Sequence, residues 1–156
     1  MILLLTGCNQ LHPVPVKERI KNYGEGHLSG SHWSITTVYG DEIEGVDWTT
    51  NNALFLDIPS KNEKKSMFRV FFGCNKSIGA YETKAQNITF MLGLTTAVLC
   101  EEFADAEYKV RQALNATSSY HLFQNELVFY NNDGVSTLGL TRRVPPHDSE
   151  KSEQDE

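Results

Sequence analysis

The sequence predicts an α+β domain in which antiparallel strands form one sheet and a single main helix packs on it. Short runs of β-type residues alternate with turn signals through most of the chain. One segment instead repeats its apolar residues at helical spacing. The length of 156 residues and the apolar content of 40% suit one domain with one core.

The expected strands are runs rich in β-branched and aromatic residues. In the first of them, Trp33, Ile35, Thr37 and Tyr39 alternate onto one face. The runs cover residues 33–39, 53–58, 67–74, 88–92, 120–123, 127–130 and 137–141. Asn132-Asp133-Gly134 separates the last two runs and predicts a hairpin turn, because glycine adopts a positive φ without steric penalty.

Residues 101–114 form the expected helix. Acidic residues lie in its first turn, and Lys109 and Arg111 follow later, as the helix dipole favours. The apolar stripe consists of Phe103, Ala106, Val110, Ala113 and Leu114. We expect this stripe to pack against the sheet.

The N-terminal residues resemble the end of a bacterial lipoprotein signal peptide. An apolar run stops at Leu5-Thr6-Gly7-Cys8, which resembles a lipobox. The resemblance implies cleavage before Cys8 and acylation of that cysteine; the alternative is a chance match in a buried strand. The apolar run is shorter than the ~7 to 15 residues of a usual signal peptide and no basic residue precedes it, so we expect the true start upstream of Met1.

The lipobox divides the chain into four expected parts. Residues 1–7 are the signal peptide remnant, 8–27 the lipidated cysteine with a flexible tether, 28–143 the folded domain, and 144–156 a disordered acidic tail. Several acyl chains would hold the protein on a membrane. Because Asn9 stands where an aspartate commonly marks inner-membrane retention, we expect an outer-membrane lipoprotein that faces the periplasm.

The charge excludes one class of partner. A net charge of −6 gives no surface suited to neutralising phosphates, so we expect no nucleic-acid binding. The basic cluster Lys61–Lys65 is better explained as a solvated loop. No apolar run approaches the ~18 residues of a membrane-spanning helix.

A set of short motifs lies between residues 72 and 134: Phe72-Gly73-Cys74-Asn75, Gly79-Ala80-Tyr81, Ile88-Thr89-Phe90 and Thr96 with Cys100, continued by Glu107, Val110, Leu114, Tyr120, Leu127 and Asp133-Gly134. Together they resemble the signature of the META domain family, to which the heat-shock protein HslJ belongs. Ala97 and Glu101 depart from the basic residue and the proline that often stand there, so a role of that basic residue is not carried over. The resemblance implies a strongly curved antiparallel sheet, like half a barrel, closed over by one helix.

The cysteines predict a disulfide. With Cys8 assigned to lipid, Cys74 and Cys100 remain, and an even pair in an exported domain is expected to be bridged. The alternative is two buried thiols on different strands. Asn75 and Gly79 likewise carry two interpretations, a binding edge or the chemistry of a tight turn or bulge after the central strand.

Nothing in the sequence predicts catalysis. There are no paired carboxylates in a shared motif, no nucleophile elbow and no phosphate loop, and no His lies near Cys74 in sequence. The five histidines, His12, His27, His32, His121 and His147, fit no metal-ligand spacing. We therefore expect no enzyme, no catalytic residue, no metal and no cofactor.

The hypothesis that the sequence supports best is a non-enzymatic, lipid-anchored envelope protein that binds a partner or has a structural role. The resemblance associates it with envelope stress or drug resistance. Many aromatic residues, from Trp33 to Phe129, exceed what a minimal core needs, so the second hypothesis is a carrier or sensor of a small apolar ligand such as lipid. A hydrolase inhibitor is a third. The expected partners are the membrane through Cys8 and an envelope protein or apolar ligand.

Overall fold

The computed structural model describes residues 28–43, 54–59 and 66–143 of the chain. The strands are β1 Ser31–Val38, β2 Asp41–Glu42, β3 Leu54–Ile58, β4 Met67–Phe72, β5 Lys76–Lys84, β6 Asn87–Thr95, β7 Ser119–Phe123, β8 Glu126–Tyr130 and β9 Ser136–Arg142. A short 3-10 turn, η3 Glu101–Phe103, leads into the helix α2 Ala104–Ala116. The expected anchor at Cys8, the tether and the acidic tail lie outside the described residues.

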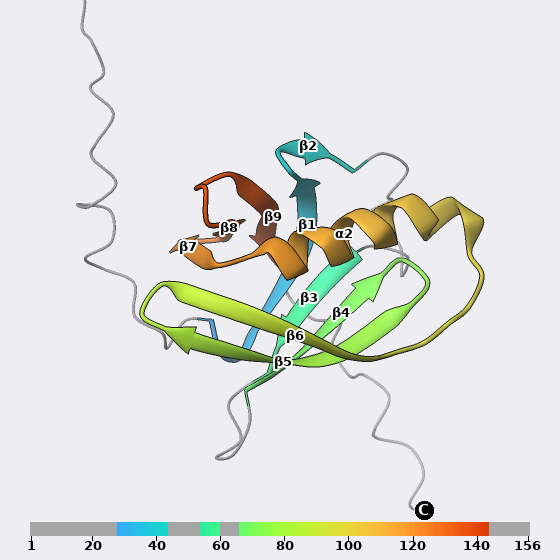
Figure 1. The fold of residues 1–156 in the computed structure, drawn as a ribbon, viewed down its shortest axis with the longest axis horizontal. Helices are drawn as coiled ribbons and strands as arrows, with labels where there is room; N and C mark the ends of the chain where they lie inside the picture. Colours follow the sequence, from blue (N-terminus) through green and yellow to red (C-terminus); the bar gives the residue numbers. More distant parts are fainter. Residues whose placement is uncertain (1–27, 44–53, 60–65, 144–156) are drawn as a thin grey trace, which may run out of the picture.

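The sheet closes on itself. Its strands follow the order β1-β3-β4-β5-β6-β7-β8-β9, every pairing is antiparallel, and β9 returns to pair with β1 from Trp33↔Arg142 to Val38↔Leu138. The expectation of an α+β half-barrel with a main helix is therefore wrong: the described residues form a closed eight-stranded antiparallel barrel with one short helix lying across it (Figure 1). β2 is a two-residue strand added beside β1.

Strand β5 is the longest element that the sequence prediction missed; the two-residue strand β2 was missed as well. Its inward residues are Ser77, Gly79 and Tyr81, which alternate with exposed or half-exposed positions. Because the first two are small, the inward face has no apolar run for a hydrophobic pattern to detect. Gly79 thus lies within a strand, at a register shift between β5 and β6, which agrees with the bulge and not with the tight turn among the structural interpretations of this position.

Strand β1 departs from the strict alternation that the sequence predicts. Its register against β9 shifts between Ile35 and Thr37, so Val38 is buried in place of Thr37. Tyr39 follows with a positive φ of 52° and is exposed. Side chains beyond the bulge point to the opposite face from the one that strict alternation predicts. One extra residue in a pattern of period two has this effect.

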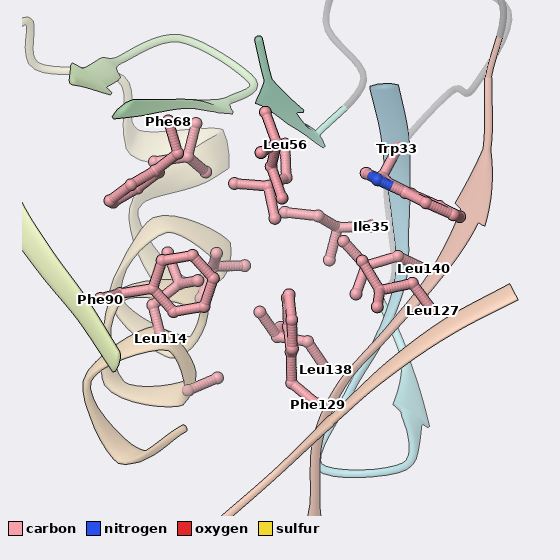
Figure 2. Packing of buried hydrophobic residues seen from close by; sticks show 14 of the residues in the cluster. Trp33, Ile35, Leu56, Phe68, Phe90, Leu114, Leu127, Phe129, Leu138 and Leu140 are labelled. Atoms are coloured by element: carbon pink, nitrogen blue, oxygen red, sulfur yellow. The ribbon is translucent and has the colours of Figure 1, made fainter. Parts of the chain in front are cut away.

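Side chains fill the interior of the barrel. Trp33, Phe68, Phe72 and Phe129 have no exposed surface. Figure 2 shows Phe68 and Phe90 on one side of the interior and Phe129 with Leu138 on the other. The ring of Phe90 contacts both Phe68 and Phe129 edge to face, with centroids 4.9 and 5.2 Å apart. The aromatic residues that looked surplus in the sequence are mostly this packed core.

Helix α2 covers the weakest seam of the barrel. Strands β6 and β7 share only the pair Asn87↔Ser119, and α2 contacts β6 beyond that point (Figure 1). A helix laid on an otherwise unpaired strand edge shields its backbone groups. The expected stripe faces inward: Val110, Ala113 and Leu114 are fully buried.

The basic residues of α2 lie mid-helix. Lys109 pairs with Asp105 at 2.7 Å and Arg111 with Glu107 at 2.8 Å, each at a spacing of four residues. The last turn of the helix has no basic side chain.

A polar cluster that the sequence did not reveal joins β1, β3 and the residue after β9. The carboxylate of Asp57 lies 3.0 Å from His32 Nδ1 and accepts a hydrogen bond from Arg143 Nη2 at 3.0 Å. The Arg143 guanidinium also lies 3.8 Å from the centre of the Phe55 ring. These contacts fasten the residue after β9 to β1 and β3, beside the pairing that closes the barrel.

Candidate functional site

Seven residues of the family motif meet at one end of the barrel. They come from the end of β4 and the turn that follows it, from the connection between β6 and η3, and from α2: Phe72, Gly73, Cys74, Asn75, Thr96, Cys100 and Glu107. The remaining motif residues lie elsewhere. Tyr81, Leu114, Tyr120 and Leu127 are buried in the barrel, and Gly134 occupies the β8–β9 turn with φ 77°. Burial raises the pKa of the Tyr81 phenol, and a hydrogen bond with Ser66 opposes that shift in part.

The side-chain amide of Asn75 forms the centre of this cluster. Its Nδ2 donates to the Val98 carbonyl and to Glu107 Oε2, both at 2.9 Å. Its Oδ1 accepts from Val98 N at 2.8 Å and from Thr96 Oγ1 at 3.0 Å. An asparagine amide has two donor hydrogens and two acceptor sites, so the capacity of this buried side chain is used in full. Asn75 therefore replaces a strand partner for the segment around Val98.

Glu107 extends the network to the barrel core. Its second oxygen, Oε1, accepts from Nε of Arg111 at 2.9 Å and from Nη2 at 2.8 Å. The guanidinium in turn lies 4.7 Å from the centre of the buried Phe72 ring. Charge-assisted, two-pronged contacts of this kind fix orientation as well as contributing energy. Through its bond with Asn75, Glu107 thus connects α2 to the β4–β5 turn.

The disulfide between Cys74 and Cys100 closes the same region covalently. Their Cα atoms lie 6.4 Å apart, and the bond joins the β4–β5 turn to the residue before η3. The structure thus agrees with the bridged interpretation of the two cysteines. Neither interpretation of Asn75 describes its role in full. The residue lies in a turn, but its side-chain amide bonds a segment more than twenty residues away in sequence.

The segment held in this way displays large apolar side chains to solvent. We call Leu94, Val98 and Leu99 the apolar ridge; their exposed fractions are 87%, 58% and 87%. Thr96 N donates to Lys76 O at 3.0 Å, and the Asn75 side chain forms hydrogen bonds with both the N–H and the carbonyl of Val98. The disulfide fixes Cys100, the residue after Leu99. The ridge was not predicted from the sequence, although the run from Leu94 to Leu99 follows neither strand nor helical periodicity and could have indicated it.

Replacing Asn75 by aspartate is expected to lower the free energy of unfolding by about 3 kcal/mol, since two buried donors are lost and a second carboxylate faces Glu107. The double variant N75D/E107Q is expected to recover part of this loss, because a glutamine amide donates to the new carboxylate. Chemical unfolding of the four proteins measures this coupling as a double-mutant cycle. The matched control is Asn125→Asp, at an exposed turn, and additive effects in the cycle would contradict the network.

Gly73 and Gly134 both adopt a positive φ, of 89° and 77°, but in different surroundings. A Cβ at Gly73 would overlap the ring of Phe103, whereas one at Gly134 meets nothing within 4 Å. Gly134→Ala is therefore expected to cost about 1 kcal/mol from backbone strain alone. Gly73→Ala is expected to cost about 2 to 3 kcal/mol, because Phe103 must move as well. Thermal unfolding compares the two, and equal losses would show that Phe103 does not limit this turn.

Within residues 28–43, 54–59 and 66–143, no three His, Cys, Asp or Glu side chains are grouped so as to hold a metal ion. No helix in the described part of the chain is long and apolar enough to cross a membrane.

The fold and the motif cluster define a class of protein: a small, closed antiparallel barrel whose motif residues brace its own connections. The family model of the META domain matches residues 26–144. The chain therefore belongs to the META domain family. No curated protein matches the sequence significantly.

Several solved structures have a fold similar to this one. The NMR structure of a protein from Burkholderia xenovorans has 18% sequence identity and a TM-score of 0.64, with 92% of this chain and 99% of that chain covered. The crystal structure of a DUF4847 family protein from Bacteroides vulgatus has 10% identity and a TM-score of 0.54, with 75% of this chain and 95% of that one covered. At these identities the similarity concerns the fold.

Proposed function

We propose that the chain is a lipid-anchored envelope protein whose META domain is a non-enzymatic binding module, and that it docks on a protein partner through the apolar ridge. The observation that carries this proposal is the 87% exposure of Leu94, near the end of β6, and of Leu99, on the segment fixed by the Asn75 amide and the disulfide. Exposed apolar side chains on a preorganised segment lose little conformational entropy when they bind. Binding energy is thus available at the ridge.

The charge beside the ridge indicates what kind of surface it fits. The exposed acids Glu101 and Glu102 follow it directly, and the whole chain has a net charge of −6. An anionic lipid surface would repel this region. An apolar pocket with a basic rim on another protein complements it. We therefore assign the ridge to such a partner.

A carrier of an apolar ligand fits the described residues less well. A ligand inside the barrel would have to displace fully buried side chains such as Phe68, Phe72 and Phe129. Interiors packed in this way have no room for a guest molecule without large local rearrangement. The two most exposed large apolar side chains, Leu94 and Leu99, lie outside the barrel, at the ridge.

The anchor rests on the lipobox resemblance at Cys8. Expressed behind a complete signal peptide, the protein is expected to fractionate with the outer membrane, and mass spectrometry of its first peptide should show a triacylated cysteine. Cys8→Ser is expected to release the domain into the soluble periplasmic fraction. An unmodified Cys8 in membrane-derived protein would refute the anchor and leave the ridge untouched.

The role of the ridge is tested by complementation in a strain that lacks the gene. Wild type is expected to restore growth on a hydrophobic antibiotic, and Leu94→Asp/Leu99→Asp is expected to fail while unfolding at the same temperature. The matched control is Val135→Asp, which changes an exposed valine in the β8–β9 turn. Full restoration by the ridge variant would contradict docking there, and a deletion strain with unchanged tolerance would contradict the envelope role.

A further inference from the structure

A second surface feature lies at the opposite ends of β6 and α2 from the apolar ridge. It is an open groove of about 670 Å³ between the start of β6, the end of α2 with the residues that follow it, and the β8–β9 turn. Asparagine, serine and threonine dominate its lining, together with one alanine and one glycine. No charged and no aromatic side chain lines it. This composition differs from both the barrel core and the acidic surface near the ridge.

The walls of the groove are firmly held. Thr117 Oγ1 donates to the Ala113 carbonyl at 2.8 Å and lies 2.9 Å from Thr137 Oγ1. Asn131 Oδ1 accepts from Asp133 N at 3.0 Å and from Val135 N at 2.9 Å, which fixes the β8–β9 turn. Two walls of the groove, the end of α2 and the β8–β9 turn, are therefore fixed before any ligand binds.

Other polar groups in the lining are not used by the fold. The side chains of Asn87, Thr89, Asn115, Ser119 and Asn132 form no hydrogen bond within the described residues. Asn87 and Ser119 face each other across the single β6–β7 pair, and Asn115 lies in the last turn of α2. Amides and hydroxyls offer both donors and acceptors. The groove thus presents an uncharged surface with both hydrogen-bond donors and hydrogen-bond acceptors.

We infer that this groove binds a neutral saccharide. Sugar hydroxyls both donate and accept, and so match amide and hydroxyl partners. The lining supplies no counter-charge for a cation or an anion. The negative end of the α2 dipole, uncompensated by any basic residue in the last turn, disfavours anions and attracts hydroxyl hydrogens. Without an aromatic face for stacking, the dissociation constant should be on the order of 1 mM.

Titration of the ¹⁵N-labelled full chain carrying Cys8→Ser tests this inference. Chitotriose and maltotriose serve as neutral saccharide probes, with spermidine and inorganic phosphate as charged comparisons. Saturable amide shifts confined to the groove are expected for at least one saccharide at about 10 mM, and none for the charged probes. The two saccharides distinguish an acetamido sugar from a plain glucan.

Substitutions locate the binding. The double variant Asn87→Ala/Asn115→Ala removes two exposed side chains and is expected to weaken binding about tenfold or more, since two hydrogen bonds are lost. Asn125→Ala, an exposed asparagine of the β7–β8 turn, is the matched control and should leave affinity unchanged. The inference is overturned if no groove amide responds to either saccharide, if the double variant binds like wild type, or if only spermidine gives saturable shifts.

Discussion

Without its Cys74–Cys100 disulfide the domain is expected to lose about 3.5 kcal/mol of unfolding free energy in the chain-entropy description. The two cysteines are 26 residues apart in sequence, so the bond restricts a long loop in the unfolded chain. In the folded state the bond also holds the residue after the apolar ridge. Denaturant unfolding of Cys74→Ser/Cys100→Ser against the parent, both carrying Cys8→Ser, measures the loss.

Two comparisons separate this effect from damage caused by the serines. Chemical reduction of the parent should produce the same loss as the double variant, and the reduced parent should regain stability on reoxidation. Loss of the disulfide should accelerate hydrogen exchange at Val98 more than in the β8–β9 turn. The disulfide and the Asn75 amide together hold the segment that contains Val98. Equal stability of the parent and the variant would refute the expected role of the bond.

Local features of this fold could be predicted from the sequence because local chemistry determines them. The stripe that ends in Val110, Ala113 and Leu114 is buried as expected, since helical spacing alone places it on one face. The Asn132-Asp133-Gly134 turn forms where glycine was needed, with φ 77° at Gly134.

Features that depend on distant partners could not be predicted. The return of β9 to β1 pairs Trp33 with Arg142, residues whose sequence neighbourhoods do not indicate that they meet. The same limit hid β5, whose inward Ser77 and Gly79 have no apolar pattern of their own. Closure of the barrel, and with it the correct fold class, follows from these long-range pairings.

The candidate site shows the same division. The motif identified which residues matter, but their contacts span large separations: the Asn75 amide bonds Val98, 23 residues away, and Glu107, 32 residues away. An asparagine in a turn is expected to bond the neighbouring backbone, so the turn interpretation predicted only contacts within the β4–β5 turn. The apolar ridge is visible only once these contacts show that the segment is fixed and that its leucines point outward.

Phe129→Ala is expected to lower the free energy of unfolding by about 4 kcal/mol, the range for deleting a fully buried phenylalanine. The seam between β6 and β7 has a single residue pair, so contacts across the interior must hold its two sides together. Phe129 on β8 supplies one such contact through its edge-to-face packing with Phe90 on β6, whose centroid is 5.2 Å away (Figure 2).

The seam gives this substitution a signature beyond lost stability. Amide exchange of Ile88 and Tyr120, whose N–H groups bond across the seam, should accelerate more than exchange in the β4–β5 pairing. Tyr108→Ala, an exposed aromatic residue on α2, is the control and should cost less than about 1 kcal/mol. If Phe129→Ala loosened both regions equally, side-chain packing across the interior would not be what keeps β6 against β7, and the helix α2 would have to carry that role alone.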